Sequence, residues 1–151
     1  MPDFAEPADP CSWVERVIAD AAADAISAGT AQVTVDRADL SADDGPPAFE
    51  VALEPKRDDA CPLRLTFDGL RPMYMSLGAQ GAGNEIWTGS VSELERFLTS
   101  AVLAVVSGRY RELEVARPFR SSRLEGRLEL GDGQTDHFAV PRGEPRQYRP
   151  Y

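Results

Sequence analysis

Few side chains in this 151-residue chain are suited to acid–base or nucleophilic chemistry. His137 is the single histidine, so a serine or cysteine hydrolase site would have to use it as its base. Its neighbour Asp136 is a poor orienting partner, because adjacent residues of a strand point to opposite faces. No Gly-x-Ser-x-Gly motif is present. Although carboxylates are plentiful enough for a two-carboxylate hydrolase, nothing singles out a pair, and the sequence favours a protein without catalytic residues.

Metal and cofactor sites also lack their usual patterns. Cys11 and Cys61 form no CxxC pair, and a zinc site would lack a second histidine. The segment 78–83 has the glycine content of a phosphate-binding loop, but a strand-like segment follows it where such a loop needs a helix N-terminus. We therefore expect no metal and no cofactor.

Four aspartates form a dense acidic group: Asp36, Asp39, Asp43 and Asp44. Their order does not match a calcium-binding EF-hand loop. They belong to an acidic first third, since residues 1–54 hold 12 acidic and 2 basic side chains, whereas residues 96–151 hold 7 acidic and 10 basic ones. The net charge of −9 disfavours nucleic acid as a partner. We expect the four aspartates to contact a basic partner protein.

The densest basic segment lies between residues 109 and 127, where six arginines alternate with apolar and acidic residues. Tyr110 and Phe119 interleave with the arginines, as in some nucleic-acid-binding strips. Acidic residues interrupt the series, so we interpret it as a solvated or salt-bridged sheet face. On this interpretation the arginines lie opposite the apolar residues Leu113, Val115, Leu124 and Leu128.

One group of residues is compatible with a small-molecule pocket: Met73, Tyr74, Met75 and Trp87. Methionine adapts to varied ligands, and a pocket between a sheet and a helix is a common binding site. Filling of the core is the simpler role for the two methionines.

Two helices are expected from apolar spacing. Residues 14–25 carry apolar side chains at i, i+3, i+4 and i+7 after a possible Ser12–Glu15 capping box. Residues 94–106 show the same apolar spacing. Ser90 or Ser92 can cap the start of this helix, and Gly108 can end it. Leu103 and Val106 widen this second apolar stripe, which predicts a helix covered on more than one side.

Alternating apolar residues predict about five strands between the two helices and about three after the second. The predicted fold is therefore α+β, with a mainly antiparallel twisted sheet and both helices packed on one face. The length suits a single domain, with an acidic, proline-rich segment at 1–10, a folded core at 11–140 and an extended tail at 141–151. We expect the arginines of the tail to lie against an acidic surface of this chain or of a second copy.

Neither a secretory signal nor a membrane-spanning apolar run is present in the sequence. We therefore expect a cytoplasmic protein with reduced cysteines and no membrane partner. The favoured function is a small, acidic, non-catalytic interaction protein, such as an inhibitor or an immunity-type binder of a basic protein. The alternatives are a small-molecule-binding protein or enzyme with a pocket between sheet and helix, and a structural homodimer.

Overall fold

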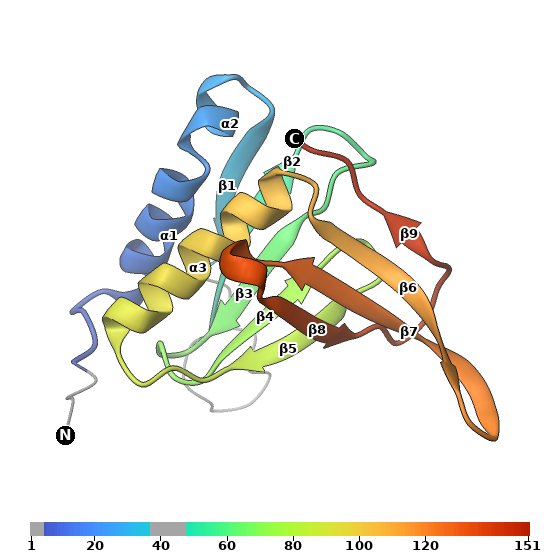
Figure 1. Cartoon of the computed structure of the whole chain (residues 1–151). Helices are drawn as coiled ribbons and strands as arrows, with labels where there is room; N and C mark the ends of the chain where they lie inside the picture. Colours follow the sequence, from blue (N-terminus) through green and yellow to red (C-terminus); the bar gives the residue numbers. More distant parts are fainter. Residues whose placement is uncertain (1–4, 37–47) are drawn as a thin grey trace.

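The computed structural model describes residues 5–36 and 48–151, and in these residues it shows three α-helices and one large sheet (Figure 1). The helices are α1 (Pro10–Ala21), α2 (Ala23–Ser27) and α3 (Val91–Val106). The strands are β1 (Ala31–Asp36), β2 (Phe49–Pro55), β3 (Leu63–Phe67), β4 (Met73–Leu77), β5 (Ala82–Ile86), β6 (Tyr110–Arg117), β7 (Arg120–Glu129), β8 (Thr135–Ala139) and β9 (Arg146–Gln147). The predicted α+β class with a mainly antiparallel sheet is confirmed. The short helix α2 is a third helix where two were expected.

The sheet consists of two antiparallel meanders. Its strand order is β1-β2-β3-β4-β5-β8-β7-β6-β9, so β1–β5 form one meander and β6–β8 the other. Helix α3 connects β5 to β6 and thus carries the chain from one meander to the far side of the other. The two meanders meet through a single residue pair, Gly83 with Ala139.

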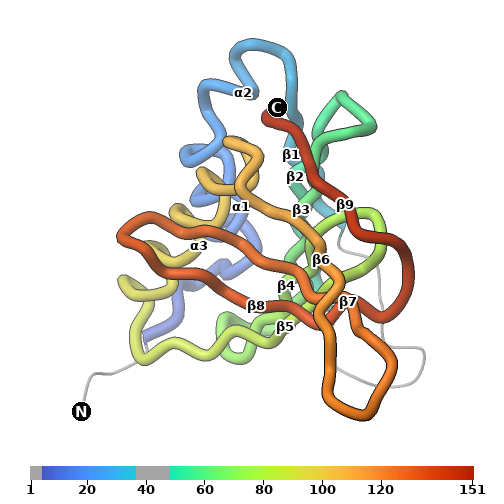
Figure 2. The backbone as a smooth tube through the Cα atoms, turned by 45° about the vertical axis from the view of Figure 1, so that its right-hand side comes forward, coloured from blue at the N-terminus to red at the C-terminus, as the bar shows by residue number. Residues whose placement is uncertain are grey.

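Helices α1 and α3 lie beside each other over one face of the sheet (Figures 1 and 2). The N-cap of α3 is Ser90, one of the two serines that the sequence left open, and its hydroxyl oxygen accepts the backbone N–H of Glu93 at 3.1 Å. The prediction for α1 is wrong by one turn, because its N-cap is Asp9. The Asp9 carboxylate accepts the Ser12 N–H, and Pro10 fits the first helical position, which needs no N–H donor.

The buried side of α3 packs into the core between the sheet and α1. Leu94, Leu98, Ala101, Val102 and Val105 are buried, whereas Leu103 is 51% exposed. Helix α3 is thus covered on two sides, by the sheet and by α1, as expected, and Leu103 lies on a side that neither of them covers. No helix in the described part of the chain is long and apolar enough to cross a membrane.

The C-terminal tail returns from β9 to the loop between β2 and β3 and to the end of α3 (Figure 2). The Arg149 N–H donates to the carbonyl of Asp59 at 2.8 Å, and the Tyr151 N–H donates to the carbonyl of Val106 at 3.0 Å. An exposed ion pair joins Arg149 to Asp59 at 3.6 Å. The tail therefore lies against its own chain, mainly through backbone hydrogen bonds and tyrosine burial.

Tyr148 anchors the tail most deeply. Its hydroxyl donates to Glu112 Oε1 at 2.9 Å and accepts the Ala79 N–H at 3.0 Å, and its ring stacks on Tyr110 at 5.5 Å. Burial raises the pKa of the Glu112 carboxyl, while the hydrogen bonds from Tyr148 and Gln80 oppose that shift. The hydroxyl of Tyr110 is buried without a hydrogen-bond partner among the described residues.

A matched pair of leucines tests the orientation of α3. We expect Leu98→Ala to lower the free energy of unfolding by about 2–5 kcal/mol, because it opens a cavity in the core. Leu103→Ala should change it by less than about 0.5 kcal/mol, because that side chain is half-exposed. Chemical denaturation of both variants measures the difference, and equal losses would contradict the packing described above.

A matched pair of tyrosines tests the anchoring of the tail. Tyr148→Phe should lower the free energy of unfolding by about 1–3 kcal/mol, because it leaves the buried Glu112 carboxylate with one donor fewer. Tyr110→Phe should leave stability unchanged or raise it, because the lost hydroxyl has no partner. Thermal unfolding of both variants provides the comparison. A larger loss for Tyr110→Phe than for Tyr148→Phe would show that this arrangement of hydrogen bonds is wrong.

Candidate functional site

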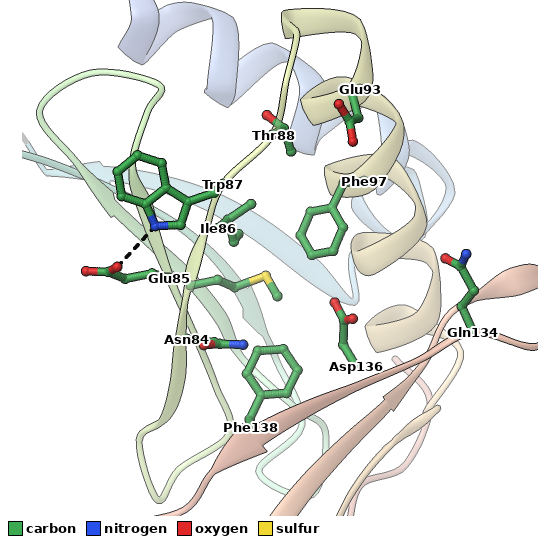
Figure 3. A pocket seen from close by; sticks show the side chains of 11 residues that line it. Asn84, Glu85, Ile86, Trp87, Thr88, Glu93, Phe97, Gln134, Asp136 and Phe138 are labelled. Carbon is green, nitrogen blue, oxygen red and sulfur yellow. Dashed lines mark hydrogen bonds between the residues drawn. The ribbon is translucent and has the colours of Figure 1, made fainter.

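The candidate site is a pocket of about 380 Å³ between the two meanders. From the Gly83–Ala139 pair, β5 and β8 diverge toward Ile86 and Asp136, where no backbone pairing joins them. The Asn84 side chain spans part of the gap and donates to the carbonyl of His137 at 3.4 Å. The first turns of α3 lie over the opening, so sheet and helix enclose the pocket together (Figure 3).

Apolar and aromatic side chains form much of the wall. Met75 and Phe138 are buried, Phe97 is partly buried, and the Trp87 ring is 60% exposed at the rim. Helix α3 places Glu93 and Phe97 on the same side because they are four residues apart, and β8 places Asp136 and Phe138 on the same face because they are two apart. The pocket therefore combines an apolar interior with carboxylates around it.

Asp136 is the most unusual polar group of the pocket. Its carboxylate points into the space between Phe97 and Phe138 (Figure 3), and within the described part of the chain it takes part in no hydrogen bond and no ion pair. Burial raises the pKa of Asp136, and the charge of the neighbouring His137 only partly opposes this shift. A half-buried carboxylate without a partner costs free energy in the unliganded protein, and such groups concentrate at functional sites.

Two further carboxylates lie around the opening, and each accepts a hydrogen bond from an N–H group of the chain. Glu85 Oε2 accepts the Trp87 indole N–H at 3.2 Å, and Glu93 Oε2 accepts the Gly89 backbone N–H at 2.8 Å. The described residues that line the pocket include no lysine, arginine or histidine. No three potential ligand side chains in residues 5–36 and 48–151 are grouped to hold one metal ion. The negative charge is thus distributed around the pocket.

The Trp87 ring is already in contact with a cation on the protein surface. The guanidinium carbon of Arg71 lies 5.9 Å from the centre of this ring. The face of a tryptophan ring attracts cations through its electron distribution. The rim of the pocket thus already carries one cation–π contact within the chain.

The predicted pocket residues are divided between two neighbouring depressions. Met75 and Trp87 line the pocket described above, while Met73 and Tyr74 line a second depression of about 340 Å³. Glu85 borders both. Met73 and Met75 are fully buried, so each contributes to the core as well as to a pocket wall.

Of the four predicted acidic residues, Asp36 alone belongs to the part of the chain that the structure describes. Asp36 ends β1, where it pairs with Glu50 of β2. Asp39, Asp43 and Asp44 lie outside the described residues. Their contact with a basic partner stays a prediction.

The sequence interpretation of the arginine-rich strands is partly wrong. Val115 pairs with Arg123 and Leu113 pairs with Glu125, so these apolar residues share a face with charged ones. The apolar residues Tyr110 and Leu128 form a cross-strand pair on the opposite, buried face. Every second residue of a strand points to the same face, so Arg111, Leu113 and Val115 share one face. The sequence interpretation had placed the arginines and these apolar residues on opposite faces.

His137 and the cysteines lie away from the pocket interior. His137 Nδ1 contacts Glu125 Oε1 at 2.9 Å on the opposite face of β8 from Asp136. Cys11 and Cys61 are free and buried, and burial raises the pKa of the Cys61 thiol, which disfavours the nucleophilic thiolate.

Comparison of the chain with protein-family models, with curated proteins and with solved structures gave no match. The site must therefore be interpreted from its own geometry. Sequence reasoning missed Asp136, Phe138, Glu93 and Phe97 as a group. The available signals were the i, i+4 spacing on the helix and the i, i+2 spacing on the strand, but neither shows that the two elements meet.

Proposed function

We propose that the protein is a non-catalytic interaction protein and that its pocket binds a lysine or arginine side chain of a basic partner. The observation that carries the proposal is the unpartnered, half-buried carboxylate of Asp136 among aromatic walls. A cation placed beside this carboxylate would neutralise it and supply its missing hydrogen bonds. The apolar walls would cover the methylene groups of the same side chain.

The rim of the pocket supports the same ligand chemistry. Glu85 and Glu93 add negative charge around the opening, and the exposed Trp87 ring offers a face for a cation. The net charge of −9 would attract a basic protein and speed its association. One lysine or arginine side chain on the basic surface of a partner would thus both occupy the pocket and neutralise its charge.

A small organic amine is the second candidate ligand. The pocket volume of about 380 Å³ lies within the range that small-molecule sites occupy. Both candidates share the cationic group, and the size of the binding molecule distinguishes them. If a basic peptide binds the pocket far more tightly than free lysine or arginine does, the ligand is a side chain of a protein partner.

Asp136→Asn tests the proposed role of the carboxylate. We expect the wild type to bind N-acetyl-arginine amide, and the variant to bind it about tenfold more weakly, because the loss of one charge pair of about 1.4 kcal/mol has this effect. The indole N–H signal of Trp87 in a nitrogen-15 NMR spectrum reports on the pocket, and that of Trp13 on α1 is an internal reference.

Glu15→Gln is the matched control for this experiment. It removes the same charge from an exposed position on α1 that does not line the pocket. We expect its affinity to equal that of the wild type. Equal weakening by both variants would show that only the overall charge matters, and the absence of any Trp87 shift with arginine or lysine derivatives would refute the proposed function.

The pH dependence of binding provides an independent check. Because the pKa of Asp136 is raised, its carboxyl stays protonated at pH values where ordinary aspartates are ionised. Binding of the cation should therefore strengthen as the pH rises through this raised pKa, by about tenfold in total, and level off above it. Glu85 and Glu93 also face the ligand, so the quantity to compare is the difference between the wild type and Asp136→Asn. A pH profile that is unchanged by the substitution would contradict the assignment.

A further inference from the structure

The hairpin of β6 and β7 extends beyond the rest of the sheet (Figure 1). Strand β8 pairs with β7 only from Glu125 to Glu129, and β9 pairs with β6 only at Arg111 and Glu112. Residues 114–124 therefore form a ribbon of two strands, with which no third strand of residues 5–36 and 48–151 pairs. An isolated ribbon of this kind is marginally stable in water, so its length is not explained by the stability of the sheet.

The end of this ribbon carries an exposed aromatic residue in an unfavourable conformation. Arg117 pairs with Arg120, which leaves Pro118 and Phe119 as the turn. Phe119 has a φ of +59° and is fully exposed. Glycine or asparagine normally occupies a turn position with positive φ, and other residues are disfavoured there. Folding therefore gains nothing from phenylalanine at this position, and backbone strain of this kind is concentrated at functional sites.

The ribbon is basic, in contrast to the chain as a whole. Residues 114–124 contain Arg117, Arg120 and Arg123 against one acidic residue, Glu114. The hydroxyl of Ser122 donates to the Glu114 carboxylate. Arg120 and Arg123 are exposed beside Phe119. The hairpin tip, residues 116–123, thus presents an aromatic ring flanked by guanidinium groups.

We infer that the hairpin tip of one copy of this chain binds in the acidic pocket of a second copy. The inference rests on the proposed function, because it names the partner of the same pocket. Phe119 matches the apolar walls formed by Phe97 and Phe138, and a neighbouring arginine matches Asp136. Site and ligand are therefore both present on one chain, with opposite charges and with aromatic groups on each side.

The tip cannot reach the pocket of its own chain. Leu128 pairs with Asp136 at the pocket end of β7, whereas Arg120 begins the strand at the tip. The eight residue steps between them span about 27 Å along the same strand. The contact must therefore form between chains, either as a closed dimer in which each tip enters the pocket of the other copy or as a head-to-tail series.

Two variants separate the components of this contact. Phe119→Ser disables the tip and leaves the pocket intact, while Asp136→Arg disables the pocket and leaves the tip intact. Unchanged melting temperatures would establish that both fold. Nitrogen-15-labelled Phe119→Ser is then titrated with unlabelled Asp136→Arg, and we expect the Trp87 indole signal to shift until it saturates.

The matched controls use the same labelled protein. Unlabelled Asp136→Arg that also carries Phe119→Ser should bind at least about tenfold more weakly, because the central aromatic residue is lost. Unlabelled Asp136→Arg that carries Leu103→Ser should bind as before, because Leu103 is an exposed apolar residue on α3, remote from the tip. In sedimentation equilibrium, each single variant alone should stay at the chain mass and their mixture should stop at twice that mass, whereas the wild type should reach at least twice the chain mass as its concentration rises.

Three outcomes overturn the inference. If Asp136→Arg causes no shift of Trp87 while N-acetyl-arginine amide does, the inference fails and the proposed function stands. If signals of the hairpin tip respond to a single-stranded oligonucleotide or to vesicles of phosphatidylserine and phosphatidylcholine, but not to a second copy, the tip belongs to another class of partner. Failure of both the second copy and the arginine derivative to shift Trp87 refutes the proposed function together with the inference.

Discussion

The single backbone pair between Gly83 and Ala139 is the constraint on which the rest of this structure depends. It is the backbone pair that joins the two meanders in the described part of the chain, where side chains, the crossing helix and the C-terminal tail make the other connections. A Cβ at Gly83 would lie 1.9 Å from the Tyr74 hydroxyl, so a larger residue there would require the partly exposed Tyr74 ring to move. One backbone pair cannot fix the relative orientation of two meanders by itself. Helix α3 and the tail therefore also hold the meanders together.

The same constraint accounts for the pocket. A complete β5–β8 ladder would have brought Asn84 and Ile86 against Phe138 and Asp136 and closed the space between them. Because the ladder stops after one pair, side chains of β5, β8 and α3 surround an opening instead. The tail connects the two meanders at the loop between β4 and β5, where Tyr148 accepts the Ala79 N–H and makes a buried hydrogen bond with Glu112. The site thus lies where the backbone pairing between β5 and β8 stops. The Asp136 carboxylate can stay unpaired there without disturbing the core.

Charge is distributed unevenly over this framework. The first third of the sequence is acidic, the pocket is lined by carboxylates, and the basic residues of the hairpin tip lie at the far end of β7. Exposed charges act over about 8 Å at physiological ionic strength, so local complementarity outweighs the net charge when two surfaces meet. An acidic chain can therefore carry a basic recognition element, provided that it projects from the body as the β6–β7 ribbon does.

The sequence by itself determined the class of fold and the burial of Leu98, and it narrowed the N-cap of α3 to Ser90 or Ser92, because helix and strand periodicities and caps are local properties. It also identified Met75 and Trp87 as pocket candidates from residue type alone. Only the tertiary structure decided that Asp136 and Phe138 face Glu93 and Phe97, since that contact depends on where β8 joins β5, more than fifty residues apart in the chain. The exposure of Phe119 was likewise invisible in the alternating pattern of β6 and β7, because it depends on which strands end before the hairpin does. Long-range pairing, which no local periodicity encodes, therefore decided both surfaces from which function is proposed.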